Sequence, residues 1–444
     1  MTTNPTIFKS YDIRGVYPDE INEEAVYDIA RAFVKHTGAT NVVIARDARL
    51  SSEILSKFLA RGLAHQGAKV CDIGQVPTEC LYFTIGNYDF DAGIMITASH
   101  NPKEYNGLKM MKRSGNDIQM VRGKDLFLSM ESDGLKEDGE VVAEQMDIWP
   151  DYIKYILSFA DLDKISPLRI VVDASNGVAG NVLSRIKDKL PIEMIALHFE
   201  PDGNFPNHGP NPLAEGAVDK ISEVIKSKRA DFGLMFDGDA DRIFLVDESG
   251  KLVKADIVLL LLAKYFLERS PNAAIAYNAI CSKSVPEVIS KWGGKPIRTQ
   301  VGFVNVREGL MENNGEMGGE LSGHYCFKDN YYMDSGMISL LILLQVLSED
   351  SRKVSQIAKE LSPYAKSPEL NFAVADKDAV LEKIKQKYSD GKQDFLDGVT
   401  VEYDGWWFNV RASNTEPLLR LTIEANTQKL LDQKKEELIS AINS

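Results

Sequence analysis

Residues 92–109 read Ala-Gly-Ile-Met-Ile-Thr-Ala-Ser-His-Asn-Pro-Lys-Glu-Tyr-Asn-Gly-Leu-Lys, and they determine how the rest of the chain is interpreted. The apolar run from Gly93 to Thr97 has the length of a buried strand. It stops at a polar turn, where Pro102 disfavours helix at the residue before it. Ser99 is therefore expected at the carboxyl end of a strand, where α/β sheets bind their ligands.

A serine beside His100, with Lys109 a short loop away, can be a nucleophile with partners for proton transfer. A polar surface turn has the same composition, so Ser-His-Asn-Pro alone does not decide between the two. Three later stretches favour the chemical interpretation.

The composition is that of a globular protein of several domains, with 444 residues, 44% hydrophobic and 26% charged. A formal net charge of −14 disfavours nucleic acid or an anionic membrane as the main partner. The four cysteines lack the paired spacing of a metal site and indicate a reducing, cytoplasmic location. The N-terminus has no signal-peptide pattern, and no apolar run is long enough to span a bilayer.

Strand and helix patterns alternate along most of the chain, which predicts an α/β fold of several units. We expect domains at 1–149, 150–252, 253–365 and 366–444, the first three α/β and the last a smaller α+β domain. In the second domain, a helix is expected over 213–228. Residues 90–97 align with residues 230–237, which indicates an internal duplication of a strand and the polar residues at its end.

Asp237, Asp239 and Asp241 alternate directly after the second of these strands, a spacing that suits a hard divalent cation. An EF-hand is the competing interpretation, since Glu248 lies at the twelfth position of such a loop. However, Arg242 occupies the position where the calcium loop needs glycine, and the flanking segments have strand patterns. Magnesium is the expected ion, because it readily keeps non-protein oxygens among its ligands.

Two further stretches combine polar side chains with glycine or a turn. Residues 318–324, Gly-Gly-Glu-Leu-Ser-Gly-His, form a loop that can approach a ligand closely and bind sugar hydroxyls. Residues 411–417, Arg-Ala-Ser-Asn-Thr-Glu-Pro, lie between two predicted strands and have the donors of a phosphate cradle. A glycine-rich turn and a polar hairpin connection are the alternatives.

In this order, the four motifs resemble those of the α-D-phosphohexomutase family, and more closely its phosphomannomutase/phosphoglucomutase branch. The resemblance extends over the whole chain. It implies three related α/β domains with mixed sheets and a smaller α+β domain, arranged around a central cleft to which each contributes a loop.

The resemblance also implies roles for the residues of the first two loops. Ser99 is expected as a phosphoserine, and the three aspartates are expected to hold Mg²⁺ together with a phosphoserine oxygen. His100 and Lys109 match groups near the transferred proton, with Lys109 the better general acid/base candidate.

Other matched residues are expected to neutralise charge or bind substrate. Arg14 and Arg242 would neutralise the moving phosphoryl group, and Tyr11 lies in the matching N-terminal element. The expected substrate-binding residues are Glu320, Ser322 and His324 for the sugar, and Arg411, Ser413, Asn414 and Thr415 for the phosphate that is not reacting.

The implied reaction is the reversible interconversion of hexose 1-phosphate and hexose 6-phosphate, with mannose, glucose or both. It would pass through a hexose 1,6-bisphosphate, with a phosphosugar as the partner and a monomer or homodimer as the assembly. A phosphoglucosamine mutase is the nearest alternative, although Asn414 favours the phosphomannomutase branch. A metal-dependent sugar-phosphate phosphatase and a non-catalytic sensor are more distant alternatives.

Two positions in the third domain depart from the family pattern. Ile280 and Phe303 stand where family members often have a basic residue and a histidine. Lys283 or Arg307 could replace these groups, so the third domain's share of substrate binding stays open.

Overall fold

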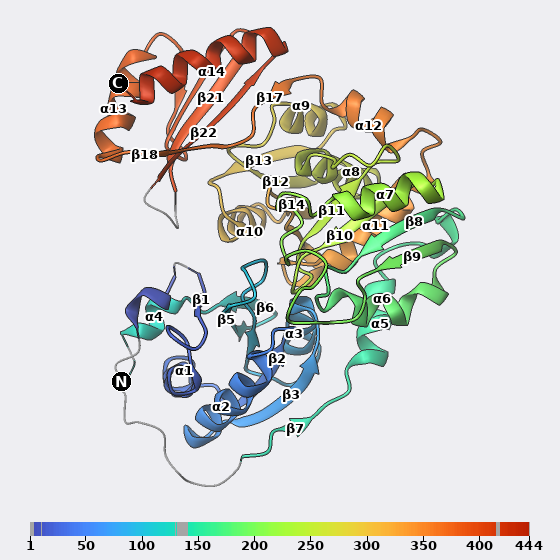
Figure 1. Ribbon diagram of the computed structural model, residues 1–444, viewed down its shortest axis with the longest axis vertical. Coiled ribbons are helices and arrows are strands. Elements are labelled where there is room, and N and C mark those ends of the chain that lie inside the picture. Colours follow the sequence, from blue (N-terminus) through green and yellow to red (C-terminus); the bar gives the residue numbers. More distant parts are fainter. Residues whose placement is uncertain (1–3, 10, 129, 131–140, 414–417, 444) are drawn as a thin grey trace. The chain divides into compact units, whose positions relative to one another are not determined.

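The computed structural model describes residues 4–9, 11–128, 130, 141–413 and 418–443 (Figure 1). The chain forms two compact units, of which the first combines residues 1–253 with 323–355 and the second combines 254–322 with 356–444. In this division, residues 323–355 group with the first unit. None of the helices among the described residues is both long and apolar enough to cross a membrane.

The first α/β segment contains a mixed sheet and its covering helices. Its elements are β1 (Ile13–Val16), α1 (Glu23–Thr37), β2 (Asn41–Arg46), α2 (Ser52–His65), β3 (Lys69–Gln75), α3 (Thr78–Asn87), β4 (Ala92–Ile96), β5 (Tyr105–Ser114), β6 (Asp117–Met120), α4 (Gly123–Phe127) and β7 (Glu144–Gln145). The strand order is β1-β5-β4-β2-β3-β7, with β6 paired to β5. Strand β2 runs parallel to β3 and β4, whereas β5 runs antiparallel to β4.

The second α/β segment repeats this plan on a smaller scale. Its elements are α5 (Trp149–Leu157), β8 (Arg169–Asp173), α6 (Ala179–Ile186), β9 (Glu193–Leu197), α7 (Asp219–Lys228), β10 (Phe232–Phe236) and β11 (Ile243–Val246). The strand order is β11-β10-β8-β9, with β11 antiparallel to β10 and the others parallel. Residues 323–355 add β15 (Tyr325–Phe327), β16 (Met333–Asp334) and α11 (Gly336–Ser348).

Strands β4 and β10 are equivalent, as the internal duplication predicts. Their residues align one for one, all are buried, and each strand lies between one antiparallel and one parallel neighbour. A Cβ atom on Gly93 would lie 2.8 Å from the Ile85 side chain, and one on Gly233 would lie 2.7 Å from Ile225. Glycine therefore lets α3 and α7 pack closely on their sheets in the same way.

The second unit contains a parallel α/β segment and an antiparallel α+β segment. The first has α8 (Ala255–Arg269), β12 (Ala274–Asn278), α9 (Ser284–Lys291), β13 (Lys295–Thr299), α10 (Phe303–Glu312) and β14 (Met317–Gly319), with β12 between β13 and β14. Helix α12 (Val354–Leu361) leads to β17 (Ala365–Lys366), β18 (Leu370–Ala373), α13 (Lys377–Lys387), β19 (Lys392–Asp394), β20 (Val399–Tyr403), β21 (Trp406–Ala412), β22 (Leu418–Ala425) and α14 (Gln428–Asn443). The strand order of this last sheet is β17-β22-β21-β20-β19, with β18 also on β22.

The α/β architecture with an α+β C-terminal segment is thus confirmed, but the predicted start of one helix differs from the structure. Helix α7 begins at Asp219 rather than at residue 213, because Gly216 adopts φ +79° and the preceding residues form turns. Lys109 lies within β5, paired with Met95 of β4, on the strand that follows the Ser99 turn.

Candidate active site

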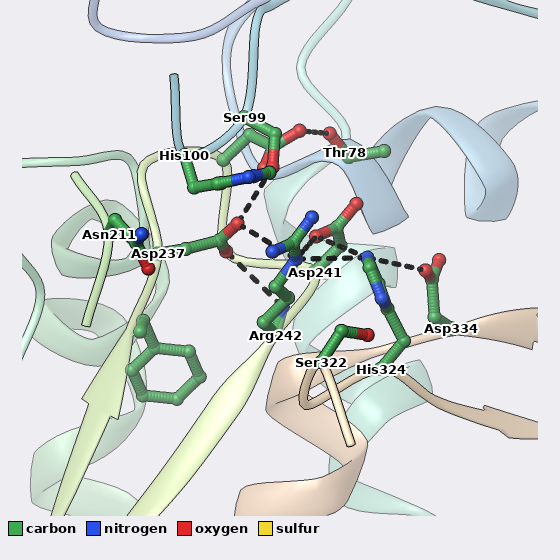
Figure 2. Close-up of polar contacts among 12 residues, drawn as sticks. Thr78, Ser99, His100, Asn211, Asp237, Asp241, Arg242, Ser322, His324 and Asp334 are labelled. Atoms are coloured by element: carbon green, nitrogen blue, oxygen red, sulfur yellow. Dashed lines mark hydrogen bonds and ion pairs between the residues drawn. The ribbon is translucent and has the colours of Figure 1, made fainter. Parts of the chain in front are cut away.

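The turn after β4 carries Ser99, whose side chain is drawn with its polar neighbours in Figure 2. The backbone of Ser99 has an unusual conformation. Its φ of 52° is in the left-handed region, which residues with a Cβ atom seldom adopt. The Ser99 N–H donates to Thr97 Oγ1 at 2.8 Å, and the side chain is buried. A backbone in this region persists where its surroundings fix it, so the turn must be held by its neighbours.

Arg49 is the residue that holds this turn. Its guanidinium donates to the carbonyl oxygens of Ser99 at 2.8 Å and Asn101 at 2.6 Å, and also to those of Pro102 and Tyr105. Asp47 accepts from Arg49 Nε at 3.1 Å and from Thr97 Oγ1 at 2.7 Å. Both side chains of this ion pair are almost completely buried.

The sequence analysis missed Arg49 and Asp47, although a signal was present. Asp47-Ala-Arg49 follows β2 directly, and β2 is the parallel neighbour of β4. The carboxyl ends of adjacent parallel strands lie at the same sheet edge, so charged residues there can reach the Ser99 turn.

The three aspartates after β10 form one cluster, and Asp237 joins it to Ser99. One carboxylate oxygen from each of Asp237, Asp239 and Asp241 lies within 4.8 Å of the others, and all three residues are buried. Ser99 Oγ donates to Asp237 Oδ2 at 2.9 Å. The two equivalent strand ends therefore bring the candidate phosphate carrier and the acidic cluster into direct contact (Figure 2).

Cationic side chains surround the acidic cluster. Lys109 Nζ donates to Asp239 Oδ2 at 2.7 Å and also contacts Asp241. Arg242 Nε lies 3.5 Å from Asp237 Oδ2 and 3.1 Å from His324 Nε2. The positive charges offset part of the repulsion among the buried carboxylates.

Burial and mutual repulsion displace the pKa values of this cluster. Burial, together with Asp241 and Asp239, raises the pKa of Asp237 to about 8. Although burial opposes it, the charge of Asp239 and Asp241 raises the pKa of Lys109, so its ammonium is held in the charged form. Arg242 and burial lower the pKa of His100, whose Nδ1 lies 3.3 Å from Ser99 Oγ, so its imidazole is neutral near pH 7.

The donor set fits a divalent cation with oxygen ligands. Three carboxylates converge within one buried cluster, and Asp239 Oδ1 is buried without a hydrogen bond among the described residues. An unpaired buried carboxylate oxygen is costly, and a hard cation would satisfy it. The cluster can therefore hold a metal ion.

Arg14 lies beside the Ser99 turn. Its guanidinium donates to Ala98 O at 3.2 Å and to Asn101 Oδ1 at 2.5 Å, and Nε pairs with Asp12 at 2.8 Å. Tyr11, from the same N-terminal element, is half-buried.

The residues of the predicted sugar loop divide between the two units. His324 lies in the first unit, where Nε2 is 3.4 Å from Asp241 Oδ1 and 3.8 Å from Asp334 Oδ2. Glu320 and Ser322 lie in the second unit, where the Ser322 hydroxyl donates to the Glu320 carboxylate. The first unit thus joins His324 to the acidic cluster, while Glu320 and Ser322 form a polar pair of their own.

The predicted phosphate loop begins at the end of β21. Arg411 is buried, pairs with Glu369 at 2.8 Å and lies opposite Arg420 of β22, which contacts the same carboxylate at 3.1 Å. Two arginines therefore share one carboxylate, which leaves positive charge for an anion. The Ser413 N–H donates to Leu418 O at 2.8 Å, whereas Asn414 and Thr415 lie outside the described residues.

The positions that depart from the family pattern lie in the second unit. Ile280 is buried, and Phe303 begins α10. Lys283 donates to Glu402 Oε1 at 2.5 Å, so this possible replacement is engaged in an ion pair. Arg307, the other possible replacement, is buried.

Comparison with known proteins gives a consistent result along the whole chain. Models of the four phosphoglucomutase/phosphomannomutase domains match in order: α/β/α domain I at residues 5–125, domain II at 150–250, domain III at 254–364 and the C-terminal domain at 369–441.

Individual relatives agree with the domain models. The chain is 35% identical to a phosphomannomutase of Vibrio cholerae over 98% of both chains, and 36% identical to one of Methanocaldococcus jannaschii over 98% of this chain and 97% of that one. A crystal structure of a phosphoglucomutase/phosphomannomutase family protein from Burkholderia thailandensis superposes with a TM-score of 0.89, at 32% identity, covering 99% of this chain and 97% of that one. The chain belongs to the phosphoglucomutase/phosphomannomutase family of phosphohexomutases, and it is an isomerase.

Proposed function

We propose that this protein is a Mg²⁺-dependent phosphomannomutase with phosphoglucomutase activity. It would interconvert hexose 1-phosphate and hexose 6-phosphate through a phosphoserine at Ser99 and a hexose 1,6-bisphosphate. The observation that supports this most strongly is the 2.9 Å contact between Ser99 Oγ and Asp237 within the buried acidic cluster. A surface serine turn would have no such contact.

The side chains around Ser99 suit phosphoryl transfer. The reaction needs positioning and charge neutralisation more than covalent chemistry. Phosphoserine would give its phosphoryl group to a hydroxyl of the bound hexose phosphate, and Ser99 would regain one from the other end of the bisphosphate. Arg14 and Arg242 lie close enough to the Ser99 turn and the aspartates to neutralise the group as it moves. Bound Mg²⁺ would add a further positive charge at the three aspartates.

A base must take the proton from the attacking sugar hydroxyl. Lys109 matches the family's general acid/base, but in the unphosphorylated protein its pKa is raised and its ammonium is paired with Asp239 and Asp241. The neutral imidazole of His100, 3.3 Å from Ser99 Oγ, is the alternative base. To act as the base, Lys109 would first have to lose the proton of its ammonium group, whereas His100 is already neutral.

The apparent affinity of the unphosphorylated protein for Mg²⁺ should rise about tenfold per unit from about pH 6 to about pH 8 and then level off. The pKa of Asp237 is raised to about 8, so its carboxyl group must lose a proton when the ion binds. Titration calorimetry in buffers of different ionisation enthalpy measures both the affinity and the released proton.

The same shift determines the stability of the metal-free protein. A raised pKa means that the folded state binds more protons than the unfolded state, so stability falls as pH rises from about 4 to about 8.

The control for the Mg²⁺ titration is Asp237→Asn, which should release no proton when Mg²⁺ binds. Equal Mg²⁺ affinity at both ends of the pH range would contradict the coupling.

Replacing Arg411 by alanine should raise KM for hexose phosphates by about 10- to 100-fold, with a smaller change in kcat, because a charged hydrogen-bond donor to the distal phosphate is lost. Steady-state kinetics with each substrate measures this. Arg269→Ala, which removes an arginine stacked on Tyr265 in the same unit, is the control. Kinetics of Arg411→Ala identical to those of wild type would exclude the proposed cradle.

A parallel assay of mannose 1-phosphate, glucose 1-phosphate and glucosamine 1-phosphate tests the overall proposal. Each reaction would contain Mg²⁺ and a catalytic amount of hexose 1,6-bisphosphate. We expect mannose 6-phosphate from mannose 1-phosphate and glucose 6-phosphate from glucose 1-phosphate. Conversion of glucosamine 1-phosphate alone would indicate a phosphoglucosamine mutase, and release of inorganic phosphate would indicate a phosphatase.

We also propose a cytoplasmic location, with a phosphosugar as the partner. The four cysteines are buried free thiols, which suits a reducing compartment.

A further inference from the structure

A second cluster of metal-ligating side chains lies outside the acidic site. It consists of Asp173, at the end of β8, with His198, directly after β9, and His208, in the loop before α7. One possible ligand atom from each lies within 4.8 Å of the others. None of the three takes part in the phosphoryl transfer proposed above.

The distances from Asp173 to the two histidines are close to those between the ligands of one ion. His198 Nδ1 lies 3.0 and 3.1 Å from the two Asp173 oxygens, and His208 Nε2 lies 3.2 Å from Oδ2. Ligands at about 2.0–2.1 Å around a tetrahedral zinc ion lie about 3.3 Å apart. A small movement of the two imidazole rings relative to Asp173 would therefore bring all three side chains to ligand distance from one ion.

The second ring nitrogen of His208 fixes which nitrogen can serve as a ligand. His208 Nδ1 lies 2.8 Å from Gly209 O, and a carbonyl oxygen can only accept, so Nδ1 carries the proton. In the neutral ring, Nε2 then points a lone pair at a buried carboxylate oxygen. That contact is unfavourable unless a cation lies between the two atoms or the ring is protonated. Orientation of a histidine ligand by a backbone carbonyl is common at metal sites.

The cluster is both fixed in place and accessible. Asp173 is fully buried and accepts the Ser175 N–H at 2.8 Å, while His198 adopts φ 52°, which directs its backbone out of β9. A cavity of about 380 Å³ is lined by both histidines and by Asp219 and Glu223 of α7, among others. An ion held by three protein ligands would keep one position open toward this cavity.

We propose that Asp173, His198 and His208 form a second metal site, which takes a first-row transition-metal dication with the chemistry of Zn²⁺. Two imidazoles and one carboxylate suit this class of ion, whereas Mg²⁺ prefers an all-oxygen site. The ion fixes the loop that contains His208 to the ends of β8 and β9. This site is independent of the proposed mutase reaction.

The experiment uses the full chain, stripped of metal and then saturated with Mg²⁺, and titrates it with Co²⁺ by visible absorption and with Zn²⁺ by calorimetry. Wild type should bind one Co²⁺ with visible bands typical of a low-coordinate site. His198→Gln and His208→Gln should each weaken binding by on the order of 100-fold. His36→Gln, which changes an exposed histidine, should bind as wild type does.

Two further measurements separate this site from the acidic one. Asp239→Asn should keep the Co²⁺ bands, and X-ray absorption of the Zn²⁺-loaded protein should show two imidazole ligands and no sulfur. Bands that vanish in Asp239→Asn and persist in His208→Gln would overturn the proposal. Absence of Co²⁺ and Zn²⁺ binding in wild type would also overturn it and would leave a buried imidazolium–carboxylate pair as the explanation of the cluster.

Discussion

Ser99→Ala should lose mutase turnover by on the order of 10⁴-fold or more, because the hydroxyl that would carry the phosphoryl group is removed. It should also take up no phosphoryl group from glucose 1,6-bisphosphate, whereas wild type should gain the mass of one. Coupled kinetics measures the first effect and intact-protein mass spectrometry the second.

To interpret Ser99→Ala, the variant must be shown to fold, and the loss of a serine hydroxyl outside the site must serve as a control. Ser227→Ala removes the hydroxyl of a serine near the end of α7 and should leave both readouts unchanged. The unfolding temperature of Ser99→Ala should be within a few degrees of that of wild type, since Ser99→Ala loses only one hydrogen bond, to Asp237. Turnover by Ser99→Ala at the wild-type rate would rule out the phosphoserine route.

Arg49→Met should lower the free energy of unfolding by about 3–5 kcal/mol, because Asp47 would be left as a buried, unpaired charge. Four carbonyl oxygens of the Ser99 turn would lose their donor as well. We expect kcat to fall by about 100-fold in the fraction that remains folded, since small displacements of a reacting group are costly. Urea denaturation and steady-state kinetics measure the two effects.

Arg46→Met is the control for Arg49→Met. Arg46 is the last residue of β2, three residues before Arg49, and it pairs with Asp72 at 3.3 Å. Both side chains of that pair reach solvent, so the loss of Arg46 should cost at most about 1 kcal/mol. Adding Asp47→Asn to Arg49→Met should restore part of the stability by removing the unpaired charge. An equal loss of unfolding free energy in Arg46→Met and Arg49→Met would show that the Ser99 turn does not depend on the buried ion pair of Arg49 and Asp47.

The sequence predicted the Ser99 and aspartate motifs at the ends of the duplicated strands. The expectation that Ser99 lies near Asp237 came from the resemblance that these motifs show to the α-D-phosphohexomutase family.

Contacts between residues far apart in the chain could not be predicted in the same way. Arg49 acts on carbonyl groups 50 to 56 residues further along, and a backbone oxygen leaves no mark in the sequence. His198 lies near Asp173 because β9 lies beside β8, and the loop before α7 brings His208 to the same place, not any spacing typical of a metal site.

The equivalence of β4 and β10 has a consequence for how the protein acquires activity as it folds. The candidate phosphate carrier belongs to one sheet and the acidic cluster to the other, and they meet through Ser99 and Asp237. A nascent or partly unfolded chain with only one sheet formed would present either Ser99 or the acidic cluster in place, but not both. It could not accept a phosphoryl group. Under the proposed function, phosphorylation of Ser99 would therefore act as a built-in check that both copies of the duplicated element have folded and docked.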